Sequence, residues 1–173
     1  MSLENVYREA MALNTITDMA KRESAAKTFF EKLNQTALPE KFNWAAEIFE
    51  GMHVKERGEQ PALIWTDLVT DEERQHTYKE LAANGNKFLN FVRKQGVEKG
   101  DNLYMLTPIV PETWFASFAG LKGGLVSVPT ATTMTEREIQ FRFEAYEPDV
   151  IVAFEGLTDL VDDALQKADC RPK

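Results

Sequence analysis

The sequence predicts an α/β fold: a partial, doubly wound and mainly parallel sheet flanked by helices, with an N-terminal helical extension and a β-hairpin. Short apolar runs recur without alternation between polar and apolar positions, which is typical of strands buried on both faces. Segments with helical periodicity and ordinary helix length separate these runs. Parallel strands need such crossovers, because a tight turn cannot join them.

An N-terminal extension, residues 1–37, precedes the predicted α/β layer, residues 38–173. Neither glycine nor proline occurs before Pro39, and apolar residues follow a period of about 3.6. Residues 4–35 are therefore predicted to be helical, with a break near residues 14–18. We expect this amphipathic segment to cover a surface of the main domain or of a partner subunit.

The layer is predicted to open with a helix and a hairpin. The helix begins after Asn43 and ends at Gly58. Its inward face is predicted to be Ala45, Ile48, Phe49 and Met52. Two short strands, 62–65 and 75–77, lie so close in sequence that they predict an antiparallel pair.

Two capping boxes mark helix starts in the rest of the layer. Glu80 lies three residues after Thr77, and Glu138 lies three residues after Thr135. In each pair, the threonine hydroxyl can accept a hydrogen bond from the backbone N–H of the glutamate, and the glutamate side chain can accept one from the backbone N–H of the threonine. Another helix begins at Pro111 and ends at the glycines at 123–124. Its apolar face is predicted to be Trp114, Phe115, Phe118 and Leu121. The predicted parallel strands are 103–106, 125–128 and 150–153.

Composition limits the classes of function. The 173 residues carry a formal net charge of -8, which disfavours nucleic acid and anionic membrane surfaces as partners. No apolar run is long enough to span a bilayer, and no secretory signal opens the chain. A single cysteine, Cys170, excludes an intramolecular disulfide. A cytoplasmic protein without membrane insertion is the expectation.

Few residues offer catalytic chemistry. His53 and His76 have no further ligand at metal-binding spacing, and both are predicted to lie at the surface. Cys170 is the fourth residue from the end and is a poor nucleophile candidate. The glycines at 120–124 follow a helix and precede a strand, so they predict a helix C-cap and not a phosphate loop. The sequence thus gives no catalytic, cofactor-binding or metal residue.

From Phe42 to about Leu165, the order of motifs resembles the N-terminal segment of AMP-forming acyl-CoA synthetases, the acyl-adenylate-forming superfamily, and in particular the medium-chain type. The motifs that carry this resemblance are Phe42–Ala45, Gln60–Trp65, Thr77–Leu81, Gly96–Asp101, Pro111-Glu112, Leu121–Gly124, Val128-Pro129 and Thr135–Arg142.

The resemblance implies a ligase that activates a carboxylic acid as an acyl-adenylate and transfers it to coenzyme A. It also implies ATP, Mg²⁺ and coenzyme A for the full-length enzyme. The Ser/Thr/Gly-rich phosphate loop, the acidic metal ligands and the C-terminal lid of the family have no counterpart among these residues. We therefore expect the chain alone to bind none of these cofactors and to be inactive. Some relatives place arginines after the strand equivalent to 150–153, whereas residues 155–159 are acidic here.

Three hypotheses follow. In the first, the chain is a piece of an acyl-CoA ligase, and the truncation is natural, engineered or due to incomplete ordering. Its partner would then be the remainder of the synthetase or a partner subunit. Alternatively, it is a non-catalytic α/β binding or assembly module from that family, which docks through the helices at 4–35. A third hypothesis is an independent flavodoxin-like ligand binder. The identity of the carboxylic acid and the oligomeric state are left open by the sequence.

Overall fold

A computed structural model of the chain describes residues 3–37 and 39–173. The expected domain boundary between residues 37 and 38 therefore adjoins residue 38, which lies outside the described ranges. The chain divides into two compact units, Met1–Asn43 and Trp44–Lys173.

The first unit contains two helices, α1 (Leu3–Leu13) and α2 (Met19–Asn34). The predicted break is confirmed, and α2 begins at its N-cap Asp18, whose carboxylate accepts a hydrogen bond from the N–H of Lys21. Neither helix contains a fully buried residue in its described part. The described residues of the two helices therefore form no sealed core of their own.

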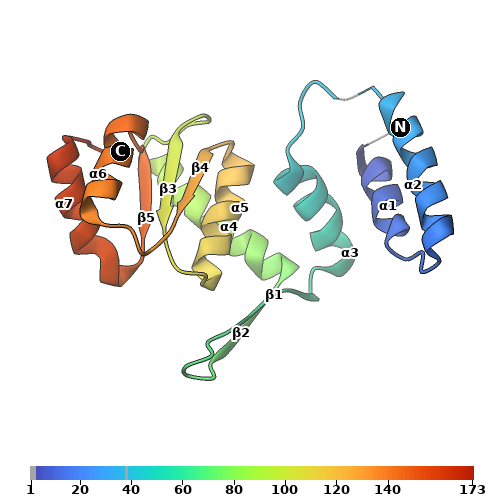
Figure 1. Cartoon of the computed structure of the whole chain (residues 1–173), viewed down its shortest axis with the longest axis horizontal. Coiled ribbons are helices and arrows are strands. Elements are labelled where there is room, and N and C mark those ends of the chain that lie inside the picture. Colours follow the sequence, from blue (N-terminus) through green and yellow to red (C-terminus); the bar gives the residue numbers. More distant parts are fainter. Residues whose placement is uncertain (1–2, 38) are drawn as a thin grey trace. The chain divides into compact units, whose positions relative to one another are not determined.

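The second unit opens with the π-helix η1 (Ala45–Val54), which continues into a short α3 (Lys55–Arg57) capped by Gly58. The four expected inward residues of this segment are all buried. Next come β1 (Pro61–Thr66) and β2 (Glu73–Thr77), which pair antiparallel as predicted. The hairpin projects away from the helices around it (Figure 1).

A three-stranded parallel sheet forms the centre of the second unit, in the order β4-β3-β5. Its strands are β3 (Asn102–Leu106), β4 (Val126–Thr130) and β5 (Val150–Ala153). Tyr104 of the central strand lies opposite Val128 on one side and Ile151 on the other.

Helices cover both faces of this sheet (Figure 1). The helices α4 (Tyr78–Lys94) and α5 (Pro111–Gly123) pack against each other on one face. The helices α6 (Glu136–Tyr146) and α7 (Thr158–Ala168) pack together on the other, and the 3₁₀ turn η2 (Glu155–Leu157) precedes α7. The predicted doubly wound α/β class is confirmed.

The central strand β3 supplies side chains to both layers. Tyr104 and Leu106 are buried against α6 and α7, whereas Leu103 and Met105 are buried on the opposite face with Ala116 of α5. Because successive side chains of a strand point to opposite faces, a continuous apolar run is what a strand covered on both faces requires.

Local hydrogen bonds define the helix starts that the sequence predicted. Both capping boxes are formed, with Thr77 and Glu80 at the start of α4 and Thr135 and Glu138 at the start of α6. At the other end of α5, Gly124 adopts a left-handed conformation with φ of 70°. This geometry confirms the glycines at 120–124 as a helix C-terminus and turn.

The predicted apolar face of α5 is only half right. Phe118 is buried, but Trp114 and Leu121 are 48% and 58% exposed. The buried side of α5 consists largely of small residues, including Ala119 and Gly120. A Cβ at Gly120 would lie 2.4 Å from Ser127 Oγ, so the helix contacts β4 too closely for large side chains there. Close approach thus decides which face turns inward.

Candidate functional site: the carboxyl ends of the strands

The loops that leave the carboxyl ends of the parallel strands form the candidate site. In open α/β sheets, ligands bind where neighbouring strands send their connections to opposite faces. The chain leaves β3 towards α5 on one face, while it leaves β4 and β5 towards α6 and α7 on the other. Connections to opposite faces therefore begin at neighbouring strands in two places, between β3 and β4 and between β3 and β5.

A cavity of about 490 Å³ lies beside β4 and α6 near this edge. Its walls include Tyr104, Met134 and Arg142. Burial raises the pKa of the Tyr104 phenol, against smaller lowering effects from a hydrogen bond with Thr130 and the charge of Arg142. A phenol with a raised pKa stays protonated at neutral pH. Tyr104 therefore lines the cavity as a neutral side chain with one polar atom.

The first turn of each helix that leaves the parallel sheet carries an acidic residue. Pro111, which has no N–H, and Glu112 begin α5. Glu136 and Glu138 lie in the first turn of α6, and Asp159 lies in that of α7. Helix N-termini usually attract phosphate through free N–H groups. Here each of the three helix starts carries at least one carboxylate in its first turn.

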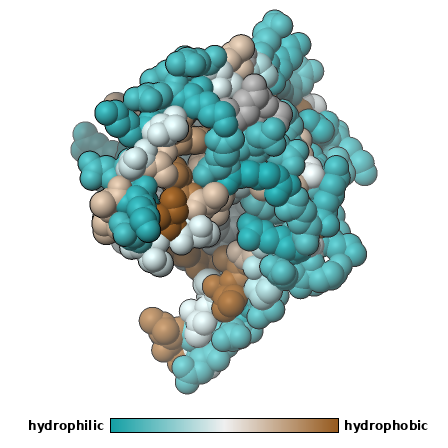
Figure 2. Space-filling view, turned by 90° about the vertical axis from the view of Figure 1, so that its right-hand side faces the viewer, coloured by the Kyte–Doolittle hydropathy of each residue, from teal (hydrophilic) through white to brown (hydrophobic). Residues whose placement is uncertain are grey.

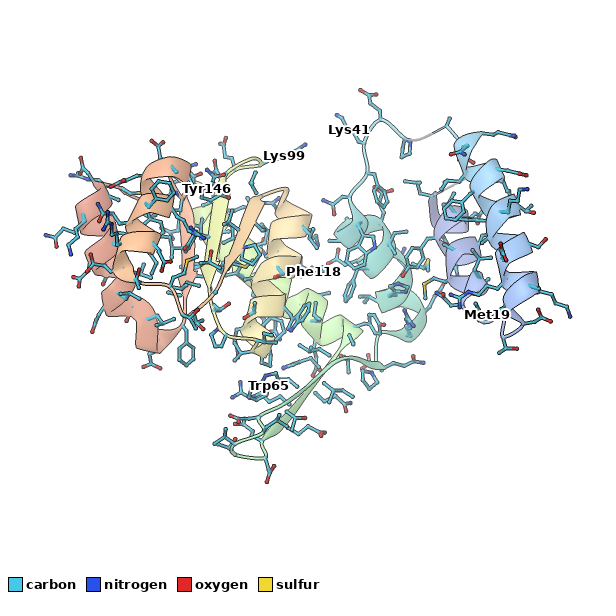
Figure 3. The ribbon with its side chains drawn as sticks, viewed as in Figure 1. Met19, Lys41, Trp65, Lys99, Phe118 and Tyr146 are labelled. Carbon is cyan, nitrogen blue, oxygen red and sulfur yellow. The ribbon has the colours of Figure 1, made fainter. Side chains whose placement is uncertain are left out.

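The β1–β2 hairpin is fastened to this edge through Trp65 (labelled in Figure 3), whose indole Nε1–H donates to the carbonyl oxygen of Ile109 at 2.7 Å. The Arg74 guanidinium lies 5.2 Å from the centre of the Trp65 ring. It also pairs with Glu72 at 2.7 Å and with Glu112 of α5 at 3.3 Å. Sequence reasoning missed this cluster, because no spacing rule connects residues 65, 74 and 112.

The histidines differ from the surface positions predicted for them. His53 is only 5% exposed, packs against Phe49, and has Nδ1 3.1 Å from an Arg57 guanidinium nitrogen. His76 is half-buried with its ring edge-on to Phe115, and its buried Nε2 has no hydrogen-bond partner within the described ranges. The prediction was wrong for His53, because the π-helix turns its position inward together with Phe49.

Metal ligation and thiolate chemistry can be checked for the part of the chain that the structure describes. Within residues 3–37 and 39–173, no three or more His, Cys, Asp or Glu side chains form a group that could hold a metal ion. Burial raises the pKa of the Cys170 thiol, and the negative charge of Glu147 raises it further, so the thiol stays protonated at neutral pH. Across the same residues, no helix combines the length and apolar character needed to span a bilayer.

Comparison with known proteins gives the family. Residues 52–173 match the family described as AMP-binding enzyme. The 4-hydroxybutyrate–CoA ligase 1 of Metallosphaera sedula is 41% identical over 125 residues, which cover 72% of this chain and 22% of that protein. The mitochondrial acyl-coenzyme A synthetase ACSM4 of Rattus norvegicus is 33% identical over 140 residues, which cover 77% of this chain and 24% of that protein.

Solved structures agree at the level of the fold. An acyl-CoA synthetase of Brucella canis superposes with a TM-score of 0.68 at 16% identity, covering 80% of this chain and 24% of that one. A benzoate CoA ligase from Burkholderia xenovorans superposes with a TM-score of 0.65 at 23% identity, covering 76% and 25%. The chain spans about a quarter of the length of the curated relatives described above. It therefore belongs to the AMP-binding enzyme family, as an N-terminal part of a member of the acyl-CoA ligase type.

Proposed function

We propose that this chain is the N-terminal scaffold of an AMP-forming acyl-CoA synthetase. The whole enzyme would activate a carboxylic acid as an acyl-adenylate and then transfer the acyl group to coenzyme A. The family match and the parallel sheet with helices packed on both faces support this lineage. The 173 residues would supply one α/β layer, and the remainder of the synthetase or a partner subunit would supply the chemistry.

The acidic helix starts carry the proposal that this part does not hold ATP. Glu112, Glu138 and Asp159 place negative charge where a phosphate would seek free N–H groups. The Thr135 N–H already donates to the Glu138 carboxylate at 2.8 Å. These charges support the proposal that ATP, Mg²⁺ and coenzyme A are bound by the rest of the enzyme.

Exposed apolar side chains favour a part of a larger enzyme over a self-contained binding module. Phe91, Trp114, Leu121 and Ile109 are each at least 48% exposed on the second unit. At the tip of the hairpin, Leu68 and Val69 are 90% and 92% exposed, and apolar surface is visible on this projection in Figure 2. The adjacent pair Leu68 and Val69 supports a contact surface at the hairpin tip, because contiguous exposed apolar surface is typical of interaction sites. A cytoplasmic location stays a prediction, which fractionation of the native cells would test.

Pyrophosphate exchange tests the assignment. The purified 173-residue chain should give no carboxylate-dependent exchange between ATP and pyrophosphate above a heat-denatured control. The polypeptide encoded by the same reading frame continued beyond codon 173 should give exchange with a panel of short- and medium-chain acids. Exchange by the short chain would refute the scaffold role, and its absence from the longer polypeptide would refute the ligase proposal.

A further inference from the structure

The helices α1 and α2 form an antiparallel helical hairpin, in which the two helices lie side by side (Figure 1). The ammonium nitrogen of Lys32 lies 2.6 Å from Oε1 of Glu9, and the Arg22 guanidinium donates to Oδ1 of Asn14 at 2.8 Å. The first bond joins the last turns of α2 to α1, and the second joins the first turn of α2 to the residue that follows α1. The two helices therefore run in opposite directions.

A groove of about 370 Å³ lies between the two helices. Its apolar lining comes from Ala12 and Leu13 of α1 and from Ala25 and Phe29 of α2. The four α2 residues that line it recur at intervals of three, one and three residues, which is the spacing of one helical stripe. Such a stripe normally turns towards a core, yet neither helix has a fully buried residue in its described part. The described residues therefore leave this apolar groove partly uncovered.

The helical hairpin is too short to form a stable unit by itself. It spans residues 3–34, whereas a folded unit of fewer than about 40 residues usually needs a disulfide, a metal or association with another chain. The single cysteine of the sequence, Cys170, lies in the second unit. No group of potential metal ligands occurs in the part of the chain that the structure describes. Association with another chain is the remaining source of stability.

Charge distinguishes the helical hairpin from the rest of the chain. Residues 3–37 carry five acidic and five basic side chains, so the formal net charge of -8 lies entirely in the remaining residues. Two copies of the second unit repel each other through this charge, whereas two helical hairpins do not. The helical hairpin is thus the part of the described chain at which two copies meet without net repulsion.

The charged residues make the groove complementary to itself. Glu9 and Lys32 both line it, and their side chains are 42% and 52% exposed, so each keeps surface for a second contact. In a two-fold dimer, residue i of one copy contacts residue j of the other, and the reverse contact also forms. When two grooves meet in this way, Glu9 of each copy can pair with Lys32 of the other. The small side chains of Ala12 and Ala25 allow the helices to approach closely.

Other occupants fit the groove less well than a second copy. A strongly acidic or strongly basic partner gains no net electrostatic attraction from a helical hairpin without net charge. A small apolar molecule would fill the groove, but it would not supply the additional helices that a unit of this size needs for a core. A second helical hairpin supplies two such helices with the matching charges.

We propose that the helical hairpin is a dimerisation element, in which the grooves of two copies face each other and the four helices form a bundle. The family match covers residues 52–173, so this element lies outside the matched segment. The inference goes beyond the proposed function and does not depend on it, because the contact involves no residue of the α/β layer.

Size-exclusion chromatography with light scattering tests the dimer. The 173-residue chain should have twice the mass of a single 19.7 kDa chain and should dissociate on dilution. The mass of a single chain at every concentration, whatever else covers the groove, would overturn the inference. A mass that rises beyond the dimer would also overturn it, because two facing grooves form a closed assembly.

Charge substitutions test whether the groove is the surface of contact. Lys32→Glu makes both charged residues of the groove acidic, and Glu9→Lys makes both basic. Each variant alone should have a dimer dissociation constant at least about tenfold higher than the parent, because like charges then face each other between copies. An equimolar mixture of the two variants should recover the dimer, because an acidic groove then faces a basic one.

The mixture separates a contact between copies from a contact within one copy. Both variants lose the Lys32–Glu9 pair of the single helical hairpin, and mixing does not restore that pair. Recovery of the dimer therefore requires that the two residues meet between copies. Ser24→Glu is the matched control, because Ser24 is exposed on α2 and does not line the groove, and this variant should dimerise like the parent. A mixture that stays monomeric, or a Ser24→Glu variant as weak as Lys32→Glu, would refute the groove as the dimer contact.

Discussion

The ammonium nitrogen of Lys122 lies 2.6 Å from Oε2 of Glu50, joining the C-terminal part of α5 to η1. Asn86 of α4 completes the cluster, since its carbonyl oxygen accepts from Lys122 at 2.7 Å and its amide nitrogen donates to Glu50 at 2.7 Å. The Lys122 and Glu50 side chains are only 25% and 26% exposed. One polar cluster therefore connects three helices on the same side of the sheet.

Loss of this cluster should destabilise the chain. Lys122→Ala removes the cation that faces Glu50 and Asn86, and we expect the free energy of unfolding to fall by about 1–3 kcal/mol in urea titration. The pair Lys79–Glu59 serves as a control, because its side chains are 67% and 81% exposed. Lys79→Ala should leave the urea midpoint unchanged. Equal effects of the two substitutions would show that the Lys122 cluster is no more than a surface pair.

The start of α4 depends on the Thr77 hydroxyl, which accepts a hydrogen bond from the N–H of Glu80 at 3.2 Å. Thr77→Ala should cost about 1 kcal/mol of stability, whereas Thr77→Ser keeps the hydroxyl and should cost little. Thermal melting of the three proteins measures the difference. An alanine variant that melts with the parent would count against a helix that begins at Tyr78.

Contact between α4 and α5 depends on Gly85. A Cβ there would lie 2.5 Å from Cδ1 of Phe118 (labelled in Figure 3) and 3.2 Å from the carbonyl oxygen of Phe115. Gly85→Ala should therefore destabilise the chain by about 1–3 kcal/mol through overpacking, although alanine is about 1 kcal/mol better in an isolated helix. Asn90→Ala, at an exposed position of the same helix, is the control and should be neutral or mildly stabilising. A Gly85→Ala variant that is more stable than the parent would contradict the close contact.

Acid should weaken the fold partly through its capping boxes. Hydrogen bonds from the backbone N–H of Thr77 and Thr135 lower the pKa of Glu80 and Glu138 respectively. A carboxylate with a lowered folded-state pKa stabilises the fold above its unfolded value of about 4.3, and this contribution disappears as pH falls through the folded value. Stability should thus decrease from about pH 5 downward. In urea titrations between pH 7 and 3, a Glu80→Gln, Glu138→Gln double variant should lose less stability than the parent, and an equal loss would refute the assignment.

The candidate site was less predictable than the fold. The sequence correctly predicted the glycines at 120–124 as a helix end, because the direction from helix to strand can be read locally. It did not predict that Trp65 and Arg74 reach the loop and helix after β3, since that contact joins segments about forty residues apart. The acidic residues of the helix starts are visible in the sequence, but only the sheet order places three of them at one edge.

The sequence alone determined the fold class of this protein and several of its helix ends. Capping boxes, helix-ending glycines and short apolar runs act through hydrogen bonds and burial patterns that lie within a few residues of each other. Tertiary structure decided the inward face of α5, the burial of His53 and the order β4-β3-β5 with its open edge at β5. These features depend on how closely distant segments approach, and a local pattern does not specify the neighbour that a side chain or strand edge will meet.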